Sequence, residues 1–220
     1  MNLLNTSSDL LGLPDTEDRV RTARIGADIA FSDTWAGENV LDLHVRKGLG
    51  GFGATDEGAG RSRTNGQQDF TSLRASFTRV QPLFGAFSAV LAGEGQYTRD
   101  ALLASEEFAL GGAAFGRAYD AAEITGDVGI AGSLEIRYTG FASPASYQLY
   151  GFYDAGTVWN RKRVILDAKR DSLASAGAGV RFGFAHDIEA SAEAAMPLTR
   201  PVVAEGDEDA RVFFRLGKRF

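Results

Sequence analysis

Apolar and polar residues alternate along most of this chain, and this two-residue period limits the folds that it can adopt. The pattern is clearest in residues 174–184, where alanine, valine and phenylalanine at even positions alternate with serine, glycine and arginine at odd positions. Successive side chains of a β-strand point to opposite faces, so this period predicts a strand with one apolar and one polar face. An amphipathic helix would show a period of about 3.6 residues instead.

We expect about ten strands from this pattern. They are residues 20–35, 40–46, 70–81, 87–98, a short strand that ends at Gly111, and residues 129–138, 147–159, 173–184, 188–198 and 211–220. Residues 1–18 are polar and rich in turn formers, and we expect a loop there. Short turns alternate with long polar loops, such as those after Trp159 and Leu198. The sequence therefore predicts one all-β unit of antiparallel strands over residues 1–220, with short turns at one end and long loops at the other.

Composition excludes several classes of function. The net charge is −6, whereas phosphate backbones need a basic stripe, so we expect no nucleic-acid partner. Cysteine is absent, which removes disulfides, thiolate zinc sites and cysteine nucleophiles. The two histidines, His44 and His186, have no metal-ligand spacing, and no set of residues suggests catalysis, so we expect neither a metal, a cofactor nor an enzyme.

The alternation does not by itself say which face of the sheet points outward. A soluble ligand-binding barrel would turn its apolar face inward, whereas an outer-membrane barrel turns it toward lipid. Three features favour lipid: aromatic residues at strand ends (Tyr147, Trp159 and Phe184), opposite charges on the polar face, and the terminal Phe220. The hypothesis from the residues alone is a transmembrane β-barrel, with the soluble barrel as an alternative.

A glycine-rich stretch with a single arginine, FALGGAAFGRAYD at residues 108–120, stands out from the strands. It is not a phosphate-binding loop, because no Lys-Ser or Lys-Thr pair follows and the spacing is not GxGxxG. Asp154 lies in FYDAG at residues 152–156, on the face opposite the aromatic residues of its strand. We expect Arg117 and Asp154 to pair; the alternative is that Arg117 is a solvated loop charge and Asp154 a turn former.

Taken together, LGGAAFGRAYD, EITGDVGIAGSLEIRY, YGFYDAGTVW and the aromatic last strand resemble the carboxy-terminal barrel of the hemolysin secretion/activation proteins. These are transporters of two-partner secretion and relatives of the BamA-type assembly factors. The resemblance runs from about residue 21 onward. It implies an outer-membrane barrel of about sixteen antiparallel strands, of which this chain would supply the carboxy-terminal part. We expect the signal peptide and the periplasmic POTRA domains of that family to be absent from residues 1–220.

The resemblance also implies roles for particular residues. A loop at about residues 108–128 would fold into the lumen, where Arg117 of its arginine motif would meet Asp154 of an F-x-D-x-G strand. The supporting motif residues would be Gly111, Gly112, Gly116, Tyr119, Phe152 and Gly156. Gly116 and Ala118 depart from the commoner VRGY motif, and a positive φ would strain an alanine at position 118. A guanidinium can hold a carboxylate through two parallel hydrogen bonds, which would anchor such a loop.

The function that the resemblance implies is a pore that secretes, and thereby activates, a hemolysin- or adhesin-type partner. Its partners would be the unfolded exoprotein, outer-membrane lipid and the barrel assembly machinery, with Phe214, Leu216 and Phe220 as the assembly signal. The alternative from the same resemblance is a BamA-type factor, whose client enters the membrane instead of crossing it. Neither function involves a chemical reaction.

Overall fold

The computed structural model describes residues 2–10, 13–50, 61–63, 65–142, 145–161, 169–184 and 188–218, with side chains from residue 18 onward. Its elements, in chain order, are β1 (Asn2–Leu10), β2 (Leu13–Ser32), β3 (Glu38–Gly48), β4 (Thr71–Pro82), β5 (Phe87–Thr98), the 3-10 turn η1 (Ala104–Glu106), β6 (Phe108–Leu110), β7 (Ile124–Gly126), β8 (Val128–Ala142), β9 (Ala145–Trp159), β10 (Arg170–Phe184), β11 (Ile188–Pro197) and β12 (Arg211–Lys218). Among these residues there is no helix with the length and hydropathy needed to cross a membrane.

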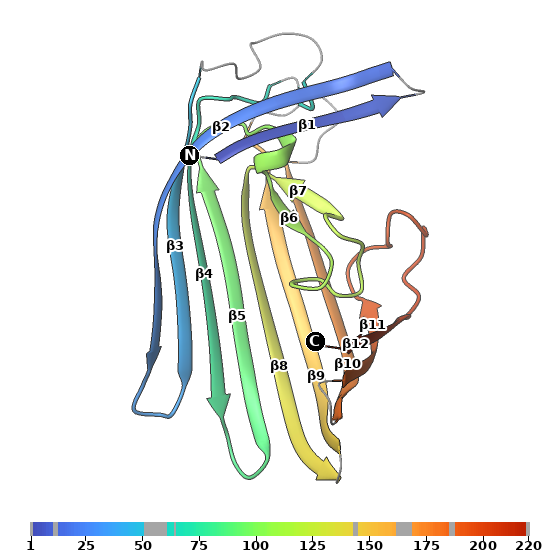
Figure 1. Ribbon diagram of the computed structural model, residues 1–220. Coiled ribbons are helices and arrows are strands. Elements are labelled where there is room, and N and C mark those ends of the chain that lie inside the picture. The colour runs from blue at the N-terminus through green and yellow to red at the C-terminus, as the bar shows by residue number, and fades with distance from the viewer. Residues whose placement is uncertain are drawn as a thin grey trace.

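Ten strands form one curved antiparallel sheet in the order β1-β2-β3-β4-β5-β8-β9-β10-β11-β12 (Figure 1). Each strand pairs with its neighbour in the chain, except that β5 pairs with β8 and leaves β6 and β7 as a separate hairpin. Among the described residues β1 and β12 are not paired with each other, so the sheet is open. The fold is all-β and antiparallel, as the alternation predicts.

Two details of the predicted strand series are wrong. Residues 2–10 form β1, which pairs with β2 from Leu13 to Thr22, although a loop was expected there. The residues of this hairpin show no apolar alternation, so the sequence shows no sign of it. Its strands are held by backbone hydrogen bonds. The strand that ends at Gly111 is β6, and it belongs to the small hairpin and not to the sheet. The total of ten sheet strands therefore agrees, but its membership differs.

The apolar face of the sheet is its outer face. Large apolar side chains are exposed there along the strands, with Ile25 77% exposed, Ile130 59% and Leu149 50%. Polar side chains of the intervening positions, including Ser133, Glu135 and Asp154, are buried on the inner face. This arrangement is the reverse of a soluble barrel that binds an apolar ligand inside.

A row of aromatic rings crosses the outer face near the short turns. Ring centroids lie 5.2 Å apart for Phe84 and Phe87, 5.1 Å for Phe87 and Tyr138, and 6.3 Å for Tyr138 and Tyr147. The register explains the row, because Phe87 faces Tyr138 across β5 and β8. Aromatic rings at strand ends are typical of the interfacial girdle of an outer-membrane barrel.

The turn between β2 and β3 is organised by one carboxylate. Asp33 Oδ1 accepts hydrogen bonds from the backbone N–H groups of Trp35 at 3.0 Å and Gly37 at 3.2 Å, and Asp33 Oδ2 is held by Arg79 Nη1. Asn39 Nδ2 donates to the same carboxylate at 3.2 Å. The bonds from Arg79, followed by those from the turn, lower the pKa of Asp33 below its usual range.

We expect this turn to give the protein an acid-sensitive contribution to stability. Because the folded-state pKa of Asp33 is lowered, its carboxylate stabilises the fold above the unfolded value of about 3.9 and loses that effect as the pH falls below it. Asp33→Asn should therefore unfold at lower urea concentration than the parent at pH 7, and the difference should shrink below about pH 4. A difference that stays constant from neutral to acid pH would contradict this assignment.

Candidate functional site

The candidate site is the arginine loop, residues 111–123, which the β6–β7 hairpin carries onto the inner face of the sheet (Figure 1). Two glycines on β8 and β9, the part of the sheet that we call the wall, leave space for the base of the loop. A Cβ at Gly129 would overlap the Phe108 ring, and a Cβ at Gly156 would lie 2.6 Å from Leu110 Cδ1. Gly156, the glycine of the FYDAG strand, is thus needed because the Leu110 side chain packs directly against its backbone.

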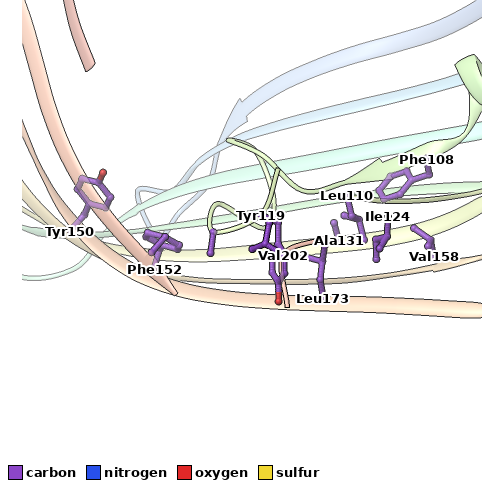
Figure 2. Close-up of a cluster of buried hydrophobic side chains, with 12 residues drawn as sticks. Phe108, Leu110, Tyr119, Ile124, Ala131, Tyr150, Phe152, Val158, Leu173 and Val202 are labelled. Carbon is purple, nitrogen blue, oxygen red and sulfur yellow. The ribbon is translucent and has the colours of Figure 1, made fainter. Parts of the chain in front are cut away.

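Figure 2 shows the apolar cluster that holds the loop against the wall. Its buried members come from the loop and its hairpin, from the strands, and from the connection between β11 and β12: Phe108, Leu110, Ala118, Tyr119, Ile124, Ala131, Tyr150, Phe152, Val158, Leu173, Ala195 and Val202. Burial of a large apolar side chain is worth about 1.5–3 kcal/mol, so these contacts can offset the entropy lost by ordering the loop.

Three glycines set the path of the loop. Gly111, Gly112 and Gly116 have φ angles of +110°, +89° and +88°, in the region that other residues avoid. Ala118 is not among the residues with positive φ, whereas Ala122 is, at φ +57°. The alanine that replaces the motif glycine is therefore not strained, because the left-handed positions lie elsewhere in the loop.

Gly116→Ala should destabilise the loop for two separable reasons. The left-handed backbone costs about 1–2 kcal/mol for a residue with a Cβ, and that Cβ would lie 2.7 Å from Leu173 Cδ1. Gly206 has a similar φ of +78° but nothing within 4 Å, so Gly206→Ala measures the backbone cost alone. We expect the thermal midpoint to fall further for Gly116→Ala than for Gly206→Ala; equal shifts would mean that Leu173 yields without cost.

The structure brings Arg117 and Asp154 together at the centre of the loop. Arg117 Nε donates to Asp154 Oδ2 and Arg117 Nη2 to Asp154 Oδ1, each at 3.0 Å. The backbone N–H groups of Gly116 and Arg117 donate to Oδ2 at 3.2 and 3.1 Å, and Ser133 Oγ donates to Oδ1 at 2.7 Å. Asp154 is fully buried, so its charge is balanced by this fork and by the loop backbone.

Arg117 also contacts the wall in two ways that the motif does not predict. Its Nη1 donates to Glu135 Oε2 at 2.6 Å, and its guanidinium carbon lies 3.4 Å from the centre of the Phe152 ring. Burial by itself would lower the pKa of Arg117, but the hydrogen bonds to Asp154 and Glu135 outweigh it and raise the pKa. The arginine therefore stays charged while largely removed from water.

Glu135 extends this site into a network that the sequence interpretation missed. It accepts hydrogen bonds from Arg137 Nε at 2.6 Å and Arg181 Nη1 at 2.8 Å as well as from Arg117. Arg181 stacks on Tyr150 at 3.6 Å, and the Tyr150 hydroxyl donates to Glu193 Oε2 at 2.7 Å. The alternation already placed Glu135 on the polar face, and its position two residues from Ser133 was the available signal.

Tyr119, the aromatic residue of the motif, bonds to other residues than those that contact Arg117. Its hydroxyl is 3.2 Å from both the Ala174 and the Arg200 carbonyl oxygens, to which it can donate. The side chain is buried in the apolar cluster. Tyr119 thus connects the arginine loop to β10 and to the connection between β11 and β12.

A second buried carboxylate holds the base of the hairpin. Asp127 is fully buried, forms an ion pair with Arg63, and accepts hydrogen bonds from the backbone N–H groups of Leu102 and Arg161, each at 2.7 Å. Arg63 Nη1 also lies 2.9 Å from Glu107. This cluster joins three connections at the long-loop end of the sheet; Asp127 lies in the EITGD segment, but the sequence interpretation assigned it no role.

Two of the three residues expected to form an assembly signal, Phe214 and Leu216, lie on the outer face. Phe214 is 81% exposed and Leu216 79% exposed on β12, while Phe220 lies outside the described residues. Their role as a signal stays a prediction. Among the described residues, no group of three or more histidine, aspartate or glutamate side chains could hold a metal ion.

The open antiparallel sheet, with an apolar outer face and a loop fastened to a charged inner face, has the architecture of an outer-membrane transporter barrel. The family model of the haemolysin secretion/activation proteins ShlB/FhaC/HecB matches residues 18–182, well over half of the chain. The chain belongs to this family.

Among solved structures, CdiB from Escherichia coli is similar to this chain with a TM-score of 0.75 and 20% sequence identity. The similarity covers 92% of this chain and 37% of CdiB, so the chain spans little more than a third of that protein's length. At this identity the likeness shows the fold. No curated protein matches the chain by sequence.

Proposed function

We propose that this chain is the carboxy-terminal part of an outer-membrane pore that secretes a hemolysin- or adhesin-type partner by two-partner secretion. The observation that carries the proposal is the arginine loop, fastened through Arg117 to buried Asp154 on the inner face of a sheet whose outer face is apolar. A loop placed in this way can regulate passage along the inner face. The family membership supports a transporter of proteins.

The inner face of β2 to β5 suits the passage of an unfolded chain. It lines a cavity of about 360 Å³ with side chains of both charges, among them Arg24, Asp42, Arg74 and Glu94. A wall of mixed charge and little apolar surface offers no strong binding site, so an extended polypeptide can move along it without being trapped. Passage in this scheme involves no chemical step.

The outer face and the last strand support the remaining partners. The exposed apolar residues and the aromatic row would contact outer-membrane lipid. Phe214 and Leu216 would be recognised by the barrel assembly machinery during insertion.

The test is to express the transporter that contains this chain, behind a signal peptide and together with a candidate exoprotein encoded beside it, and to measure the exoprotein in the medium. The proposal expects a heat-modifiable band in the outer membrane and secretion that Arg117→Ala abolishes. Arg200→Ala, which removes only a half-exposed ion pair with Asp171, is the matched control and should leave secretion unchanged. A soluble, detergent-independent protein would overturn the membrane assignment, and membrane insertion of the exoprotein in place of release would indicate a BamA-type factor.

A further inference from the structure

Arg117 fastens the arginine loop to β9 and β8, where its acceptors Asp154 and Glu135 lie. The loop is also held by Arg211, the first residue of β12. Arg211 Nη1 donates to the Ala118 carbonyl oxygen at 3.1 Å, and Arg211 Nη2 donates to Asp120 Oδ1 at 2.8 Å. Arg117 therefore ties the loop to β8 and β9, and Arg211 ties the adjacent loop residues Ala118 and Asp120 to β12.

The geometry of Arg211 depends on a guanidinium. One fork reaches a backbone carbonyl and a carboxylate at the same time, and Nη2 also lies 3.3 Å from Glu205 Oε1. Ala118 is fully buried, so its carbonyl needs a partner inside the protein. A lysine ammonium could reach either the carbonyl or the carboxylate, but its point charge does not copy the fork.

The connection between β11 and β12, residues 198–210, packs on the same part of the loop. The Val203 N–H group donates to Glu123 Oε1 at 2.7 Å, and Val202 is fully buried in the apolar cluster with Tyr119. The Tyr119 hydroxyl reaches the Arg200 carbonyl oxygen. Arginine loop, connection and first residue of β12 thus form one packed unit.

We propose that Arg211 is a second positioning residue, which keeps the arginine loop docked and couples its position to the last strand and its preceding connection. The consequence for secretion rests on the function proposed above. The position of the loop is nevertheless a property of the folded chain and can be measured without transport.

Ser175 offers a reporter for this position. It is fully buried on β10, directly opposite Asp154 in the register, and its Oγ has no hydrogen-bond partner among the described residues. The chain contains no cysteine, so Ser175→Cys introduces a single thiol of nearly the same size. Its rate of reaction with a maleimide, in the chain folded in detergent, reports release of the loop.

In this background we expect Arg211→Ala to raise the reaction rate about tenfold, since a hydrogen bond to a charged group can shift a local opening equilibrium by that factor. Arg211→Lys should give an intermediate rate. Asp120→Ala should also raise the rate. The fold-increase in the double variant should be smaller than the product of the fold-increases in the two single variants, because both substitutions remove the same contact. Arg215→Ala, on the same face of β12, is the matched control and should leave the rate within about twofold of the parent.

A second reporter separates loop release from general loosening of the sheet. Ser72 is buried on β4, away from the arginine loop, and Ser72→Cys should react at the same rate with and without Arg211→Ala. An unchanged rate at Ser175→Cys, or equal increases at both reporters, would overturn the proposal. Failure of secretion in the parent chain would count against the proposed function but would leave these rates interpretable.

Discussion

Arg117→Ala is expected to weaken docking of the arginine loop by about 3–5 kcal/mol, because it leaves the buried charge of Asp154 without its counter-charge. Asp154 would keep its bonds from Ser133 and from two backbone N–H groups, which do not replace the guanidinium. The measurement is amide hydrogen exchange at Gly116 and residue 117, whose N–H groups donate to Asp154 in the docked loop. Exchange there should accelerate by about a hundredfold or more.

The matched variant is Arg117→Lys. Lysine keeps the positive charge but cannot donate two parallel bonds to Asp154 while reaching Glu135, so we expect it to recover less than half of the lost protection. Full recovery would show that charge alone holds the loop and that the fork geometry is irrelevant. Exchange that is unchanged in Arg117→Ala would show that the apolar cluster suffices to dock the loop.

Asp127→Ala is the second substitution with a large expected effect. It removes one of the two carboxylates paired with Arg63, which keeps Glu107, and leaves the buried N–H groups of Leu102 and Arg161 without their partner, at a cost of about 1–3 kcal/mol for each unsatisfied group. Asp127→Asn keeps the shape and one acceptor oxygen, so its effect should be smaller. Unfolding in urea, followed by tryptophan fluorescence, measures both.

An exposed ion pair provides the control for Asp127. Asp171 lies 3.3 Å from Arg200, with side chains 44% and 27% exposed, and pairs of this kind contribute about 0–1 kcal/mol. Asp171→Ala should therefore shift the urea midpoint little. Equal shifts for Asp127→Ala and Asp171→Ala would mean that the buried Asp127 cluster contributes no more to the free energy of unfolding than an exposed ion pair.

Much of the fold could be predicted from the sequence because alternation is a local property. A two-residue period shows which residues share a face of the strand. It placed Asp154 and Glu135 on the polar face before any partner was known. It failed where no face is apolar: β1 shows no alternation, and its pairing with β2 rests on backbone hydrogen bonds that any residue but proline can make. It also could not separate β6 from the sheet, because three residues carry too little pattern.

The sequence by itself determined the strands from β2 onward that alternate, the two faces of the sheet and the two segments that contain Arg117 and Asp154. Only the tertiary structure decided which partners these residues have. Glu135 joins Arg117 through the register of β8 with β9, and Arg211 reaches Ala118 and Asp120 from a strand far along the chain. Such contacts depend on where the loop docks, and in sequence a docked arginine looks the same as a solvated one.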